Sequence, residues 1–296
     1  MTTLNRIASK THKFFIFLIA LCAFIGTSAF AQNSPAENSL LWKIEGNGLS
    51  KSSYIFGTVH MICQEQFNMP DKVKNALANT EQSYLEINLA APDIAAQSQK
   101  YMLTDKSLAT QISKEDYHYL DSLVKTKLKM NLTRLDKVKP MMIMAMLLQS
   151  SFTCKVVSFE SEVIKLTQAA NKPVAGLSTV EEQYSFMDKI FDVKDLGKYL
   201  KDLNDAELSK IFKQLHDAYL KEDLKALDAL LMNMNTSNPE AYKQLLPVRN
   251  HLWADRMPSI IQSKPTMFAI GSGHLLGTEG VVYLLKEKGY TVTPVH

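Results

Sequence analysis

Two short segments, one near each end of the chain, carry the same arrangement of glycine and histidine. The sequence GTVH ends at His60 and the sequence GSGH ends at His274, and each follows an apolar stretch. The glycines of these motifs, Gly57, Gly271 and Gly273, permit tight turns and a close approach of the backbone. Because ligands bind beyond the carboxyl ends of strands in α/β sheets, both imidazoles are expected to face one cavity if their strands are neighbours.

A third residue that could take part in chemistry is Glu86, which lies in the mostly apolar segment 84–87. A carboxylate in such a segment is costly to bury unless it has a partner. His60, Glu86 and His274 together form a ligand set suited to Zn, Mn or Co, with positions left for water. A metal of this kind would lower the pKa of the water and polarise a substrate carbonyl.

Arg249 is a further candidate, because Arg249, Trp253 and Arg256 fall on one face of an expected helix. Arg249 is interpreted either as a group that binds a substrate carboxylate or pairs with Glu86, or as a surface cation beside a buried tryptophan. Three other histidines lie in polar helical surroundings and are expected to be solvated: His118, His216 and His251. The methionines of the apolar segment 141–148 are expected to pack in a core.

The elements that must position these residues alternate between strands and helices along the chain. Strands are expected near residues 40–45, 53–56, 82–88, 156–159, 173–177, 266–270 and 290–292. Helices are expected near residues 70–79, 95–102, 114–128, 140–150, 160–170, 249–262 and 278–288. This alternation predicts an α/β fold whose sheet is covered by helices on both faces. Residues 180–246 are rich in helix, with a break at 233–239, and are expected to form an insertion over the sheet edge that acts as a lid.

The first 31 residues have the pattern of a cleavable signal peptide. Basic residues precede an apolar run at 14–25, and the small residues Ala29 and Ala31 follow it. The run is shorter than the roughly 20 apolar residues that span a bilayer, which argues against an uncleaved anchor. We therefore expect cleavage after Ala31, a flexible leader at 32–39, a single domain at 40–296, and a periplasmic or secreted protein without an integral membrane segment.

Export changes how the cysteines are interpreted. Cleavage would leave Cys63 and Cys154, and a lone pair in an oxidising compartment is expected to form a disulfide. In the chain-entropy model a bridge closing a loop of about ninety residues contributes roughly 4 kcal/mol. A nucleophilic cysteine and a metal-ligating cysteine are the alternatives, but neither residue lies in a CxxC or Cys-His context.

Composition excludes several classes of protein. The chain has 296 residues, 46% of them hydrophobic, so it has enough apolar side chains for a core and is not a disordered polymer. Its 33 basic and 30 acidic residues give a formal charge of +3, but the expected signal segment holds Arg6, Lys10 and Lys13 and no acid. The remainder is neutral, which argues against a nucleic-acid partner. The sequence does not indicate an oligomeric state.

The motifs together resemble those of the TraB/PrgY/GumN family, which includes the TIKI metalloproteases of animals. The segments LWKI at 41–44 and YIFGTVH at 54–60 are similar to the family's opening motif, and FAIGSGHL at 268–275 to its closing motif. Between them, KPVAGL at 172–177 and the pair Arg249 and Asn250 are similar to its middle signatures. The resemblance covers nearly the whole chain after the signal segment.

The resemblance implies a central mixed sheet flanked by helices, like that of the erythromycin esterase and ChaN-like proteins, and a divalent-metal-dependent peptidase for the TIKI branch. It assigns His60, Glu86 and His274 as metal ligands, and Glu86 and Arg249 as catalytic residues. Thr58, Asn250 and Glu160 are expected to contact substrate or to support the ligands. The sequence departs from the family pattern at two positions, where Val248 and Ser178 replace residues that are usually acidic.

Three hypotheses follow from the sequence. The first is an exported hydrolase of peptide or small-molecule substrates that uses Mn, Co or Zn, with Glu86 as a third ligand or as the general base. The second is an envelope protein that captures a peptide or haem without turnover, as PrgY-like and ChaN-like relatives are thought to do. The third is an envelope protein in which the histidines and Glu86 form a structural hydrogen-bond network.

Overall fold

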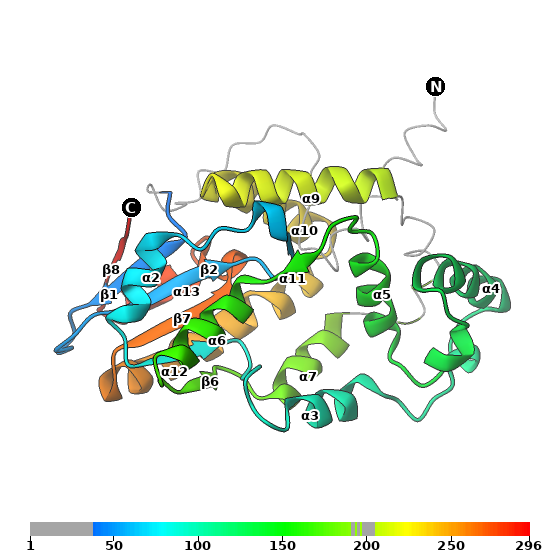
Figure 1. Cartoon of the computed structure of the whole chain (residues 1–296), viewed down its shortest axis with the longest axis horizontal. Helices are drawn as coiled ribbons and strands as arrows, with labels where there is room; N and C mark the ends of the chain where they lie inside the picture. The colour runs from blue at the N-terminus through cyan, green and yellow to red at the C-terminus, as the bar shows by residue number, and fades with distance from the viewer. Residues whose placement is uncertain (1–37, 191–192, 194–195, 197–204) are drawn as a thin grey trace.

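A six-stranded mixed sheet forms the centre of the computed structural model, which describes residues 38–190, 193, 196 and 205–296 (Figure 1). The expected signal segment and most of the expected leader lie outside these residues. The strand order is β6-β4-β7-β2-β1-β8. The strands are β1 (Leu41–Glu45), β2 (Ser53–Thr58), β4 (Gln82–Leu85), β6 (Val174–Gly176), β7 (Thr266–Gly271) and β8 (Thr291–Pro294).

Strand β7 is central to the site because it runs parallel to both of its neighbours, β2 and β4. β4 also pairs in parallel with β6, whereas β1 pairs antiparallel with β2 and β8. The first five residues of β7 are all buried, as expected for a parallel strand that is covered on both faces. The carboxyl ends of β4, β7 and β2 therefore meet at one edge of the sheet.

The described helices lie around this sheet. They are α2 (Asp71–Ala78), α3 (Ile94–Met102), α4 (Lys114–Leu123), α5 (Pro140–Gln149), α6 (Phe159–Ala169), α7 (Val180–Ile190), α9 (Asp205–Leu220), α10 (Leu224–Ser237), α11 (Pro239–Leu245), α12 (Pro247–Ser263) and α13 (Val281–Glu287). Short 3₁₀ segments are η1 (Gln64–Gln66), η2 (Leu108–Thr110), η4 (Leu132–Leu135) and η6 (Ser272–Leu275), and η3 (Val124–Leu128) is a π-helical turn. A proline in the first turn begins α5, α11 and α12, where its missing N–H is not needed.

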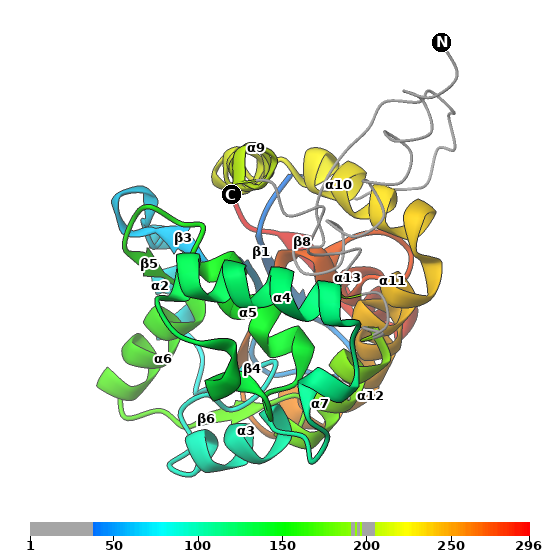
Figure 2. The same ribbon diagram turned by 90° about the vertical axis from the view of Figure 1, so that its right-hand side faces the viewer.

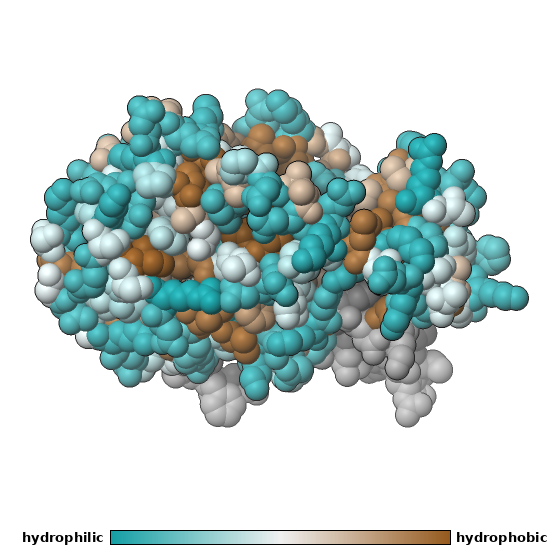
Figure 3. Space-filling view, turned by 90° about the horizontal axis from the view of Figure 1, so that it is seen from below, coloured by the Kyte–Doolittle hydropathy of each residue, from teal (hydrophilic) through white to brown (hydrophobic). Residues whose placement is uncertain are grey.

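Some of the helices lie together beside the sheet. In Figure 1 the sheet lies on the left and α3, α4, α5 and α7 lie on the right, and Figure 2 shows these helices in front of the sheet. A buried cluster around α4 and α5 is distinct from the main core on the sheet. On the face seen in Figure 3, hydrophobic residues lie in separate areas among hydrophilic ones. Among the described helices, none combines the length and the apolar character that a bilayer crossing needs.

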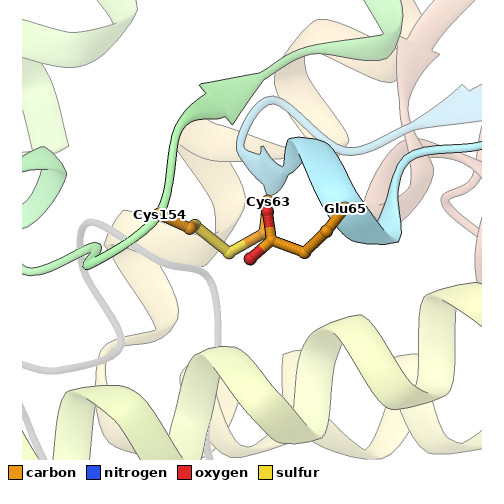
Figure 4. A group of neighbouring side chains, drawn as sticks. All are labelled: Cys63, Glu65 and Cys154. Atoms are coloured by element: carbon orange, nitrogen blue, oxygen red, sulfur yellow. A yellow bond between two sulfur atoms is a disulfide. The ribbon is translucent and has the colours of Figure 1, made fainter.

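A second, two-stranded sheet pairs β3 (Ile62–Cys63) with β5 (Val156–Val157). Beside it the Cys63–Cys154 disulfide joins segments 91 positions apart, with 5.6 Å between the Cα atoms (Figure 4). This confirms the predicted disulfide. The small sheet and the disulfide together tether the loop that follows β2 to the segment that precedes α6.

The structure confirms the α/β fold with a central mixed sheet and corrects several local expectations. β4 ends at Leu85 rather than at Asn88, although one further backbone hydrogen bond, from the N–H of Ser178 to the carbonyl of Glu86, follows its pairing with β6. The expected break at 233–239 shortens to residue 238, since α10 continues to Ser237 and the Asn238 side chain caps α11. His216 was expected to be solvated but is buried, with its Nε2 donating to the carbonyl of Met61 at 2.8 Å. The two-residue strand β3 was not predicted, because two residues carry no readable periodicity.

Candidate functional site

The three predicted ligands lie at the carboxyl ends of three adjacent strands. His60 lies two residues beyond β2, Glu86 is the first residue after β4, and His274 lies in η6, directly after β7. The Nε2 atom of His60 is 3.8 Å from Glu86 Oε1, and the Nε2 atom of His274 is 3.7 Å from the same oxygen. Two imidazoles from opposite ends of the chain thus flank one carboxylate oxygen.

Gly271 lies between these three side chains. Its N–H donates to Glu86 Oε1 at 2.9 Å. A Cβ atom at this position would be 3.2 Å from Glu86 Oε1, 3.5 Å from His60 Nε2 and 3.6 Å from His274 Cδ2. The absence of a side chain therefore leaves open the space that the three potential ligands border.

Gly57 and Gly273 serve packing instead. A Cβ at Gly57 would be 2.6 Å from a methyl group of Leu275, so glycine allows η6 to pack closely on β2. A Cβ at Gly273 would be 3.2 Å from a methyl group of Leu231. The two turns can therefore approach each other and the helices above them.

A carboxylate orients the imidazole of His60. Glu160, in the first turn of α6, has its Oε1 atom 2.7 Å from His60 Nδ1, and Thr58 Oγ1 donates to the same oxygen. The helix dipole favours a negative charge at this end of α6. The charge of Glu160 raises the pKa of His60, and water screens that effect because the imidazole is 63% exposed. In the neutral ring, Nδ1 carries the proton and Nε2 presents a lone pair toward Glu86.

An amide orients the imidazole of His274 in the same way. The Asn250 side chain donates from Nδ2 to the carbonyl of Glu279 at 2.7 Å, so its Oδ1 is the atom that accepts from His274 Nδ1 at 2.5 Å. Burial and, to a smaller extent, the charge of Arg249 lower the pKa of His274 to about 3. His274 is therefore neutral at pH 7, and its Nε2 atom is an acceptor.

Arg249 is buried and pairs with Glu86. Its Nη2 donates to Glu86 Oε2 and, at 2.8 Å, to Gln183 Oε1, while its Nη1 is 3.2 Å from His274 Nε2. The guanidinium lies over the Trp253 ring, with 4.6 Å from Cζ to the ring centroid. Burial would raise the pKa of Glu86, but the positive charge of Arg249 holds that pKa below its ordinary range.

These contacts decide between the interpretations of Arg249 that the sequence left open. The side chain is 2% exposed, so it is not a surface cation. It pairs with Glu86 through Oε2, which leaves Oε1 of the same carboxylate facing the two imidazoles. Glu160 and Asn250 each contact the Nδ1 atom of one of the two histidines, and Thr58 donates to Glu160.

Two contacts near the site were not anticipated. The Gln183 side chain, which the sequence analysis did not single out, accepts from Arg249 at 2.8 Å. Ser178, one of the two departures from the family pattern, accepts a hydrogen bond from Trp253 Nε1 at 2.8 Å. Neither contact has a signal in sequence spacing, because both join α12 to residues far away in the chain.

The site opens into a cavity of about 400 Å³. His60, Glu86, Arg249 and His274 contribute to its lining, and the remaining lining residues are mostly apolar side chains from α5, α7, α9, α10 and α11. The helices between residues 180 and 246 therefore border the same space as the three potential ligands. Their action as a lid stays a prediction.

His60, Glu86 and His274 offer the donor atoms of a transition-metal site, although these atoms lie slightly too far apart. Within the described ranges, the one group of three His, Cys, Asp or Glu donors that all lie within 4.8 Å of one another is Cys63, Glu65 and Cys154. The disulfide occupies both sulfur atoms of that group (Figure 4), which makes it a poor metal site. His60, Glu86 and His274 are spaced more widely, and Arg249 Nη1 lies 3.2 Å from His274 Nε2, so this nitrogen is free for a cation only if the guanidinium turns away. The types of the donor atoms and the opening at Gly271 suit a divalent cation.

Comparisons with known proteins identify the family of this chain. The model of the TraB/PrgY/gumN family matches residues 40–294. Metalloprotease TIKI2 of Danio rerio is 23% identical over 351 residues, which cover 93% of this chain and 67% of that protein. No solved structure matches the chain. The match spans both Gly-x-x-His turns and all the strands that carry the site, and the chain belongs to the TraB/PrgY/gumN family.

Proposed function

We propose that this chain is an exported, divalent-metal-dependent hydrolase that cleaves peptides. The observation that carries the proposal is the position of the two imidazoles. The Nε2 atom of each lies within 4 Å of Glu86 Oε1, and the Nδ1 atom of each contacts an oxygen of another side chain. Oxygen partners on Nδ1 are typical of histidines whose Nε2 binds a metal. Similarity to a metalloprotease adds support.

The residues that would hold the cation are His60, His274 and Glu86. When bound, a cation such as Mn, Co or Zn would supply a Lewis acid that lowers the pKa of a water molecule and polarises the substrate carbonyl. Arg249 and the surrounding charges make Glu86 a weak base. This favours the role of Glu86 as a ligand over its role as the general base.

The supporting residues have distinct tasks in this proposal. Glu160 and Thr58 keep the Nδ1 proton of His60 in place, and Asn250 does the same for His274. Arg249 binds one oxygen of Glu86 and so directs the other toward the two imidazoles. His60 is the exposed member of the set, and an inward shift of its ring would be needed to close the spacing around a cation.

The proposal of export rests on the predicted signal segment and on the disulfide. Structural disulfides persist in oxidising compartments and are rare in the cytosol. The location is therefore proposed to be the periplasm or the extracellular space.

The test uses the full-length gene product, expressed in an exporting bacterium and purified in its processed form. We expect stoichiometric metal by elemental analysis, and cleavage of a peptide library after loading with Mn, Co or Zn. His60→Ala and His274→Ala should lose both metal and activity, whereas His118→Ala, at an exposed position on α4, should lose neither. Equal activity of wild type and His60→Ala in every metal would reject the proposal.

Capture without turnover is the second candidate, because a largely apolar cavity beside an exposed histidine suits a bound peptide or haem as well as a cleaved one. Tight binding of peptide by the metal-loaded protein with no cleavage would favour capture. A Soret band on haem titration that His274→Ala abolishes would favour haem.

A further inference from the structure

Most of the cavity lining is apolar, and the site residues occupy one part of it. The apolar part, called the wall below, includes the side chains of Met61, Met142, Met187, Leu231 and Leu246. Among the described lining residues, the charged carboxylate and guanidinium belong to Glu86 and Arg249, which pair with each other. A charged side chain that lies against this apolar wall would therefore lose water without gaining a partner there.

The apolar wall begins immediately beside the proposed ligands. Gly271 borders Glu86 and His60, and Gly273, two residues later in the same turn, borders Leu231 and Leu246. A substrate whose reacting carbonyl lies at Gly271 thus places the neighbouring side chain against these leucines.

We infer that the cavity binds an uncharged apolar side chain, of the size of leucine, methionine or phenylalanine, next to the bond that is cleaved. This inference rests on the proposed peptidase function and specifies its substrate class. A volume of about 400 Å³ is within the range of ligand pockets and is ample for one such side chain. Methionines adapt to several apolar shapes, so we expect a preference for apolar residues as a class rather than for one of them.

The test compares end-blocked pentapeptides of alanine that carry Leu, Met, Phe, Asp or Lys at the central position. We expect kcat/KM to be roughly 10- to 100-fold higher for the apolar residues than for the charged ones. Met142→Glu places a charge on the wall at a partly exposed site outside the core clusters and should abolish the preference. Met142→Leu should keep it, and Gln149→Glu, at an exposed position on the same helix, is the matched control.

Calorimetric binding of the same peptides separates this inference from the proposed function. Equal cleavage of apolar and charged peptides would overturn the inference and leave the peptidase standing. The wild-type protein could bind the leucine peptide, lose this binding on Met142→Glu, and cleave no peptide in any form. That result would support the cavity as an apolar site and overturn the proposed peptidase. Neither binding nor cleavage of apolar peptides, in protein with an unchanged melting temperature, would overturn the inference.

Discussion

Replacing Glu86 by glutamine removes the counter-charge of a guanidinium that is almost fully buried. Arg249 is 2% exposed, and its other partners are neutral: Gln183, His274 and the carbonyl of Leu245. Loss of one member of a buried ion pair typically costs about 3–5 kcal/mol. A glutamine oxygen can still accept from Arg249, so we expect a loss near the lower end, about 3 kcal/mol. That is a large part of the roughly 5–15 kcal/mol by which folded proteins are stable.

The assay is urea unfolding in the presence of EDTA, so that metal binding does not contribute. The fluorescence of Trp253 is a suitable signal, because the centre of its ring lies 4.6 Å from the Arg249 guanidinium and 4.5 Å from the centre of the His274 ring. With an m-value of about 3 kcal/mol/M, the midpoint should fall by about 1 M.

The matched control is Glu182→Gln, which breaks an ion pair with Arg256 on the same helix. Those two side chains are 31% and 36% exposed, so the loss should be below about 1 kcal/mol. A loss for Glu86→Gln no larger than that of the control would refute the idea that Arg249 depends on this carboxylate.

The dependence of this loss on pH has a defined sign. The pKa of Glu86 is lowered in the folded protein, so its stabilisation is present above the ordinary carboxyl pKa and is lost as pH falls through the folded-state value. The difference between wild type and Glu86→Gln should therefore narrow below about pH 4.5.

Three further predictions concern the disulfide, the opening at the site and the buried histidine. Replacing Cys63 and Cys154 together by serine should lower the unfolding free energy by about 4–5 kcal/mol, because the bridge closes a loop of 91 residues; urea unfolding measures this. Gly271→Ala should weaken metal affinity by roughly 10-fold or more, since the methyl group enters the space between the ligands, and calorimetric metal titration measures it. Burial lowers the pKa of His216, so its contribution to stability is present above about pH 6.5 and is lost as pH falls through the lowered value. Stability of His216→Gln, followed by thermal unfolding, should depend less on pH between about 6.5 and 5 than that of wild type.

Each of these predictions has a contrary result. Wild-type unfolding that is unchanged by a reductant would show that the disulfide does not stabilise the fold. Metal affinity that survives Gly271→Ala would place the cation elsewhere. Parallel pH profiles for wild type and His216→Gln would show that burial of this ring does not control stability in that range.

Much of the fold could be predicted from the sequence, because its signals are local. Apolar runs bounded by glycine, proline and asparagine mark β1, β2 and β7, and prolines mark the starts of α5 and α12. The ends of elements were less predictable. β4 ends at Leu85, and its register with β6 joins residues about ninety positions apart, which local sequence patterns do not encode.

The candidate site could be predicted only in part. The types of His60, Glu86 and His274 and their places after apolar segments were readable in one dimension. Their contacts were not. The Glu160 carboxylate reaches His60 because the disulfide and the β3–β5 pairing bring α6 to the loop after β2, and no spacing in the sequence encodes that approach.

The sequence by itself determined the residue types at the site, the glycines that let two turns come close, the alternation of strands and helices, and the family. Only the tertiary structure decided that β7 lies between β2 and β4, that Arg249 is a buried partner of Glu86, and that His216 lies inside rather than outside. The physical reason is the distance along the chain over which each kind of interaction acts. Backbone propensity and hydrophobic period act over a few residues, whereas ion pairs, burial and strand order depend on which distant segments exclude water together.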